Sequence, residues 1–79
     1  MRKRPMIYVQ WEDIQTLSGG WKEGEMKIKP YLCQTVGFLI KKTKQHLVLA
    51  HSLSPDGHYA DITVIPQGTV KYWVRLVPK

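Results

Sequence analysis

The sequence predicts an all-β fold, a small five-stranded antiparallel barrel of the SH3-like or Sm-like type with a long first loop. Five short runs are rich in β-branched and aromatic residues, and Pro, Gly and Asp clusters separate several of them. No run is long enough to predict a helix. Gly37 interrupts the strongest strand pattern, which predicts a bulge or a tight bend that curls the sheet. An open sheet with one helix is the alternative.

The stretch Tyr31 to Ala50 predicts the hairpin on which the other segments pack. It contains two apolar runs, Val36 to Ile40 and Leu47 to Ala50, joined by the polar connector Lys41 to His46. Each run has the length of a strand rather than of a helix. We therefore expect strands over residues 31–42 and 47–53.

The N-terminal part divides into a short arm and a strand. Residues 1–5 form a basic, loosely held arm that contains three cations, and residues 6–79 are expected to form a single β-barrel domain. Met6 to Trp11 is the first strand, in which alternation groups Ile7, Val9 and Trp11 on one face. We expect this face to point inward, with Trp11 in the core.

Residues 12–29 have no clear hydrophobic period and form the long first loop. Asp13 is expected to cap a turn over Ile14 to Leu17. Met26 and Ile28 alternate with lysines and predict a short edge strand closed by Pro30. Long loops in small compact domains are often functional, which draws attention to Asp13 and Trp21.

Two turns and two strands complete the chain. Ser54 to Gly57 has the residue types of a tight turn, and Pro66 to Thr69 predicts a second turn or a single helical turn. Between them lies the strand Tyr59 to Ile65, and Val70 to Val77 is the last strand. Alternation gives that strand an apolar face and a second, partly basic face: Val70, Tyr72, Val74 and Leu76 on the first, and Lys71, Trp73 and Arg75 on the second.

Size and charge restrict the partners. The chain has 79 residues and a formal charge of +6, which favours anionic partners such as nucleotides or nucleic acid. A domain this small has limited core depth, so a homo-oligomer is expected. The single cysteine, Cys33, excludes an internal disulfide, and no apolar stretch has the length of a membrane span or of a signal peptide. We expect a cytoplasmic protein without a membrane partner.

Motifs for catalysis are missing from the sequence. It contains no Gly-rich phosphate loop, no Gly-x-Ser-x-Gly turn and no His-Glu-x-x-His pair, so we expect no enzymatic activity, no cofactor and no metal site. Four polar residues surround one predicted turn, where two histidines could perform acid–base chemistry. A polar hairpin end is the simpler interpretation of this group: His51, Asp56, His58 and Asp61.

Binding chemistry is better represented than catalysis. Lys71, Trp73 and Arg75 are predicted to share one face, where an indole can stack on a base while the cations hold phosphate. The alternative is that Trp73 packs under the long loop and leaves two solvated cations beside it. Three residues on or near the loops are further candidates for the ligand site: Asp13, Trp21 and Tyr31.

The order of landmarks resembles a group of short proteins encoded by bacteriophages and prophages, mostly of unassigned function. The similar pieces span most of the chain: Val9 to Trp11 with Asp13, Ser18 to Trp21, Cys33 to Ile40, Leu47 to Ala50, Ile65-Pro66 with Gly68, and Val70-Lys71. Because most of these are strand and turn positions, they support a shared fold more than a shared activity. The resemblance implies a phage accessory role in the host cytoplasm, such as countering host defence.

Together these expectations describe a non-enzymatic phage accessory protein that sequesters an anionic nucleotide of the cyclic-nucleotide type to blunt host defence. Two alternatives remain open: an SH3-like module that binds nucleic acid, and an inhibitor that blocks a host protein.

Overall fold

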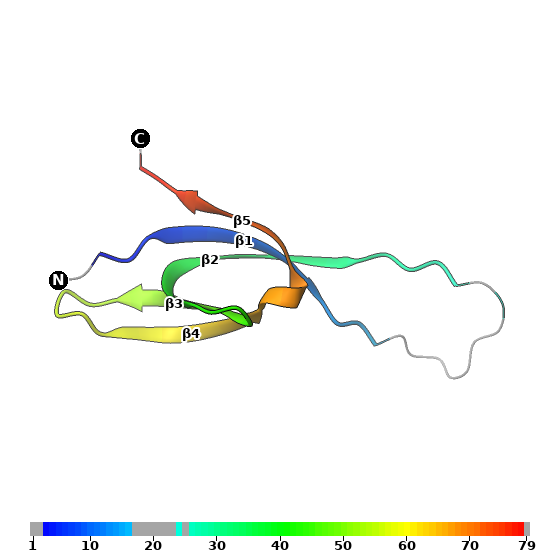
Figure 1. Cartoon of the computed structure of the whole chain (residues 1–79), viewed down its shortest axis with the longest axis horizontal. Coiled ribbons are helices and arrows are strands. Elements are labelled where there is room, and N and C mark those ends of the chain that lie inside the picture. The colour runs from blue at the N-terminus through cyan, green and yellow to red at the C-terminus, as the bar shows by residue number, and fades with distance from the viewer. Residues whose placement is uncertain (1–2, 17–23, 25, 79) are drawn as a thin grey trace.

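The protein is built from five antiparallel strands in a single sheet, with almost no helix (Figure 1). The computed structural model describes residues 3–16, 24 and 26–78. The elements follow the order β1 Met6–Asp13, β2 Tyr31–Lys42, β3 His46–Leu53, β4 Tyr59–Pro66, the 3-10 helix η1 Gln67–Thr69, and β5 Val70–Leu76.

The strands lie in the order β4-β3-β2-β1-β5, so the last strand returns to pair with the first. Within the described residues β4 and β5 form no hydrogen-bonded pair, and the sheet is open between them. The all-β class and the five strands are confirmed, whereas closure into a barrel is not. Among the described residues, no helix has the length and apolar character needed to cross a membrane.

Most strand bounds agree with the sequence prediction, and the main exception lies in the first loop. Met26 to Pro30 are described outside any strand, so the predicted edge strand there is wrong. Pro30 has no N–H to contribute to a ladder, and β2 begins at the next residue, Tyr31. The predicted turn over Ile14 to Leu17 reaches beyond the described residues, and its described part, 14–16, is not helical.

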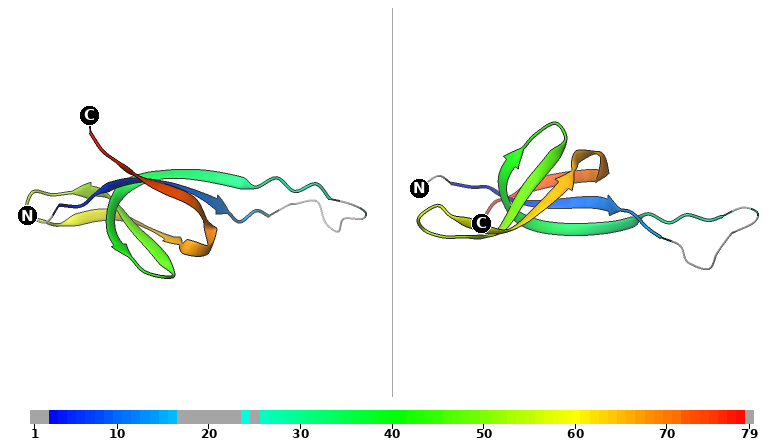
Figure 2. Two further views of the ribbon diagram at one scale, coloured as in Figure 1. Left: turned by 45° about the horizontal axis from the view of Figure 1, so that its top comes forward. Right: turned by 90° about the horizontal axis from the view of Figure 1, so that it is seen from below.

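The core lies where the sheet folds back on itself. Five apolar side chains at 0–1 % exposure form it: Ile7 and Val9 of β1, Leu47 and Leu49 of β3, and Ile65 of β4. Since β2 separates β1 from β3 in the sheet, these side chains meet only because β2 bends (Figure 2). The Ile7 face is therefore the inward face of β1, as predicted, and Trp11 packs against the core.

Gly37 lies at the bend because the backbone of β3 comes close to it. A Cβ at this position would lie 3.0 Å from the carbonyl oxygen of Ala50 and 3.2 Å from the Cβ of Leu49. The pairing register passes through Gly37 without interruption, and the irregularity falls between Leu39 and Lys41 instead. Gly37 thus permits close packing, while the bulge belongs to the following residues.

The residues ahead of β1 are attached to the bent strand. The backbone N–H of Leu39 donates to the carbonyl oxygen of Pro5 at 2.8 Å, and Nη1 of Arg4 donates to that of Ile40 at 3.0 Å. The Arg4 guanidinium also lies 5.8 Å from the ring centroid of Tyr59 in β4. Arg4 and Pro5 are therefore bound in place rather than loosely held, while the preceding Arg2 lies outside the described residues.

A shift in the pairing register with β1 decides which residues of β5 face the core. Trp73 lies opposite Val9 and Arg75 opposite Ile7, so both lie on the core side of the sheet. Tyr72 and Val74 lie opposite Gln10 and Tyr8, on the other side.

Strict alternation therefore fails at the start of β5. Val70 lies opposite Trp11 and packs against the core, because a shift between Gln10 and Trp11 leaves Lys71 as the extra residue. The prediction that Val70 shares a face with Tyr72, Val74 and Leu76 is wrong. The prediction that Lys71 shares a face with Trp73 loses its basis, because alternation does not extend across a bulge.

Gly37→Ala is expected to lower the free energy of unfolding by about 1–3 kcal/mol, because its Cβ meets backbone rather than a movable side-chain end. Chemical denaturation measures this loss. Gly68→Ala is the matched control: its methyl group would point into open space, with no described atom beyond its chain neighbours within 4 Å, so stability should change by less than about 1 kcal/mol. Equal effects of the two substitutions would contradict the close-packed bend.

Candidate functional site

The predicted site residues separate toward different parts of the sheet. Asp13 and Tyr31 lie directly opposite each other where β1 and β2 extend past the start of β5. Lys71 is close to that end, because its Nζ lies 2.9 Å from Oε1 of Glu12. Trp73 and Arg75 lie farther along β5, on the core side. Trp21 lies outside the described residues.

The end of the sheet with Asp13 and Lys71 is poorly suited to an anion. A cleft of about 540 Å³ there is lined by the carboxylates of Glu12 and Asp13 and by one cation, Lys71. Glu12 already pairs with that cation, and Oδ1 of Asp13 accepts a hydrogen bond from the N–H of Ile14 at 2.8 Å. The local charge is therefore not positive. Tyr31 is exposed beside this end, without a place in the cleft lining.

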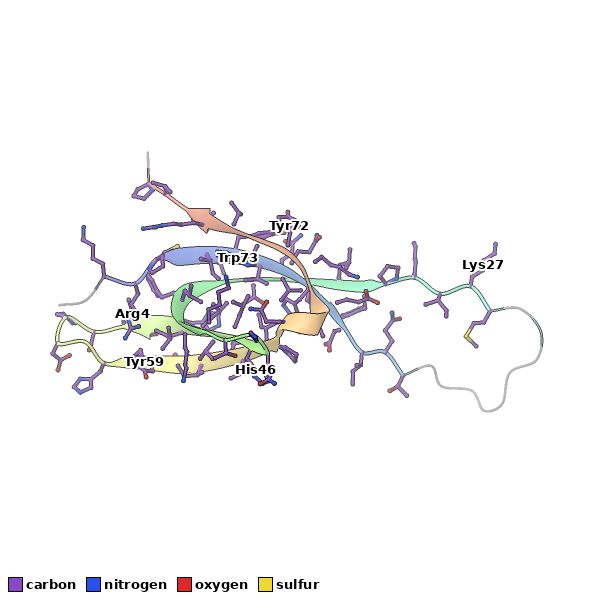
Figure 3. All side chains as sticks on the ribbon, in the orientation of Figure 1. Arg4, Lys27, His46, Tyr59, Tyr72 and Trp73 are labelled. Carbon is purple, nitrogen blue, oxygen red and sulfur yellow. The ribbon has the colours of Figure 1, made fainter. Side chains whose placement is uncertain are left out.

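Trp73 lies at the margin of the core and is neither sealed in the interior nor fully exposed. Its exposed fraction is 37 %. Lys42 of β2 places its Nζ 5.3 Å from the centroid of the indole ring, within cation–π distance. Figure 3 shows Trp73 and Tyr72 on β5, with Arg4 and Tyr59 at the end of the sheet near the β3–β4 turn. Trp73 therefore combines a partly exposed indole with a cation from the neighbouring part of β2.

Arg75 links this indole to a second cleft. Trp73 and Arg75 share one side of β5 and are two residues apart, which is about 7 Å along a strand. Arg75 lines a cleft of about 600 Å³ together with Lys3 and Arg4, where the N-terminal residues, the β3–β4 turn and the end of β5 meet. The described lining contains no carboxylate, and its remaining walls are largely aliphatic or proline, including Met6, Leu53, Pro55 and Leu76.

We call Lys3, Arg4, Lys42, Trp73 and Arg75 the basic seam. It contains only two of the six residues predicted from the sequence. Lys42 belongs to the connector predicted to be polar; it is exposed, and its pairing partner on β3 is the fully buried Leu47. Arg4 belongs to the arm predicted to be loosely held. Neither role has a local sequence signal, because both depend on which strands lie side by side.

Trp11 has a structural position. Its Nε1 donates to Oγ1 of Thr35 on the neighbouring strand at 2.9 Å, and its ring packs against the core. This satisfies the one polar group of a half-buried indole. The prediction that Trp11 belongs to the core is confirmed.

The polar residues at the β3–β4 turn form separate local contacts. His58 Nδ1 lies 3.0 Å from Oδ2 of Asp56, and Oδ1 of the same carboxylate accepts a hydrogen bond from Oγ of Ser54. By contrast, Nε2 of His51 lies 3.0 Å from Oγ1 of Thr63. Because the two histidines have different partners, they do not converge on one reacting atom. In the part of the chain that the structure describes, no three His, Cys, Asp or Glu side chains gather as metal ligands.

Comparisons with protein-family models, with curated proteins and with solved structures gave no match.

The hydrogen bond from the Ser54 side chain, with further ones from backbone N–H and His58, lowers the pKa of Asp56 below its ordinary value of 3.8. A carboxyl with a depressed folded-state pKa stabilises the fold above its unfolded pKa, and this contribution is lost as pH falls through the folded value. We therefore expect the stability advantage of the wild type over Asp56→Asn to shrink as pH falls below 3.8. Denaturation at a series of pH values measures it. An NMR titration showing an ordinary pKa for Asp56, unchanged by Ser54→Ala, would contradict this assignment.

Proposed function

We propose that this protein is a non-enzymatic binding module that captures an anionic, nucleotide-type ligand on the basic seam. The observation that carries the proposal is the position of Arg75, which shares the core side of β5 with Trp73 and also lines a cleft with Lys3 and Arg4. Among the described residues of that lining there is no carboxylate. A planar group and a phosphate about 7 Å apart along a strand can therefore be held together.

In this mode the base stacks on the exposed part of the Trp73 indole. Stacking of a base on an aromatic side chain contributes about 1–3 kcal/mol and tolerates different bases, because each base has a π face. Lys42 lies over the same ring and turns from the indole to the phosphate when the base arrives. The cation is kept beside the ligand throughout, and no covalent step is needed.

Arg4 and Arg75 hold the phosphate end. One Nη of Arg4 is fixed on the Ile40 carbonyl oxygen and the guanidinium lies against Tyr59, which leaves its other donors oriented in advance. Hydrogen bonds from a guanidinium to phosphate are charge-assisted and roughly twice as strong as neutral ones. The net charge of +6 adds long-range attraction for the same kind of ligand.

The proposal includes a finer fold class, an incompletely closed barrel of the SH3-like type. Three features support it: a meander whose last strand returns to the first, a core enclosed by the folded sheet, and a 3-10 turn before the last strand. In this arrangement the seam occupies the side on which the barrel is open.

We further propose that capture serves a phage accessory role in the host cytoplasm, where holding a signal nucleotide away from its receptor blunts host defence. The support for this role is the resemblance to short phage and prophage proteins. Binding of nucleic acid and blocking of a host protein remain alternative predictions. A comparison of oligonucleotides with small nucleotides separates the first of them from capture of a small ligand.

Thermal denaturation with a panel of cyclic dinucleotides and cyclic ADP-ribose derivatives tests the proposal. A ligand present at 100 times its Kd is expected to stabilise the folded protein by about 2.7 kcal/mol. Trp73→Ala and Arg75→Ala should each remove most of this stabilisation. Lys71→Ala is the matched control, since it removes one cation from the same strand but one that is paired with Glu12.

Three results would contradict the proposal. The panel could give no shift, Lys71→Ala could weaken binding as much as Arg75→Ala, or single-stranded oligonucleotides could bind while mononucleotides and dinucleotides do not. In the last case an affinity that falls steeply with salt would assign the seam to nucleic acid, because each phosphate contact releases counterions.

A further inference from the structure

The side of the sheet that faces away from the core carries an exposed, uncharged patch. The pairing register sets Val36, Tyr8 and Val74 side by side across β2, β1 and β5, and Gln34, Gln10 and Tyr72 in the next row. We call these six residues the outer face. Met6 and Leu76 follow on the same side, but they line the cleft of the basic seam and are not part of the outer face.

The apolar members of this face are well exposed. The exposed fractions of Val36, Val74 and Tyr72 are 44 %, 47 % and 52 %. Antiparallel sheets with one solvated face normally carry polar side chains there, in alternation with the buried ones. Here the six residues on that face are valine, tyrosine and glutamine, so the charged side chains expected on a solvated face are missing.

Charge distribution limits what can cover the patch. The chain contains 12 lysines and arginines, yet none of the six outer-face residues is charged. Glu12, the next residue on this side of β1, is paired with Lys71. Two copies of a protein with a charge of +6 repel each other over most orientations, but this face can approach a second copy of itself without bringing cations into contact.

The centre of the outer face is polar but neutral, which favours a protein surface over hydrocarbon. Gln10 and Gln34 lie directly opposite each other, and the rings of Tyr8 and Tyr72 lie 5.8 Å apart. Burial raises the pKa of Tyr8, and a hydrogen bond with Tyr72 raises it further. Acyl chains would leave these amides without hydrogen-bond partners, which is unfavourable.

A second copy supplies the missing partners. Each glutamine amide carries both donors and an acceptor, so two identical pairs related by a two-fold axis can satisfy each other. We propose that the outer face is the interface of a symmetric homodimer in which two sheets pack face to face as a sandwich.

Such a dimer leaves the basic seam free. Trp73 and Arg75 lie on the opposite side of β5 from Tyr72 and Val74, so each protomer keeps its own open seam. The dimer therefore does not depend on the proposed ligand, and each proposal can fail without the other.

Analytical ultracentrifugation of the full chain tests the interface. At roughly 100 μM, a concentration that populates a dimer with micromolar Kd, the wild type is expected to sediment as a dimer. Val74→Glu and Val36→Glu should sediment as monomers, because each places two carboxylates across the two-fold interface. Val64→Glu is the matched control, since Val64 is 54 % exposed on β4, beyond the bend of β2.

The folded state of each variant is checked by circular dichroism and thermal denaturation before sedimentation. Val64→Glu should remain a dimer with the wild-type association constant. A wild type that is monomeric at this concentration would overturn the proposal, as would a Val64→Glu variant that dissociates as fully as Val74→Glu. A monomer that co-sediments with phosphatidylcholine vesicles would assign the outer face to a membrane surface instead.

Discussion

The structure depends on the fold-back of one sheet across its central strand. Ile7 and Val9 reach Leu47, Leu49 and Ile65 only because β2 bends between them. Gly37 favours that bend, since a Cβ at this position would lie only 3.0 Å from the carbonyl oxygen of Ala50. The bend creates the small core, exposes the outer face on one side, and brings the end of β5 toward the β3–β4 turn on the other.

A single extra residue in β5 decides which side chains serve the core and which serve the surface. Lys71 interrupts the ladder against β1, so Val70 packs inward beside Trp11 while Tyr72 and Val74 point outward. The aromatic and basic residues Trp73 and Arg75 then border the core instead of forming an independent outer wall. The sides that the β5 residues of the basic seam and of the outer face occupy follow from this one irregularity.

The sequence alone predicts the local features of this fold, but it does not predict how the strands pair. Alternation identifies the inward face of β1 and the position of Trp11, and turn chemistry locates Ser54 to Gly57, where Gly57 adopts a φ of 91°. Strand order and bulges depend on contacts between distant segments, so a strict period groups Lys71 with Trp73 although the bulge breaks that period. Arg4 and Lys42 are not predicted as site residues for the same reason, because their neighbours in the site come from other strands.

The unpaired margins of β4 and β5 have a mechanical consequence. Within the described residues, the ladder of hydrogen bonds between the two halves of the sheet runs through β2 alone, and elsewhere the halves are joined by the packing of core side chains. The cleft of the basic seam has Arg75 on one half and Pro55 on the other. A ligand that contacts both walls of the cleft would hold the two halves of the sheet together. Its binding would stiffen the whole molecule and slow amide hydrogen exchange far from the point of contact.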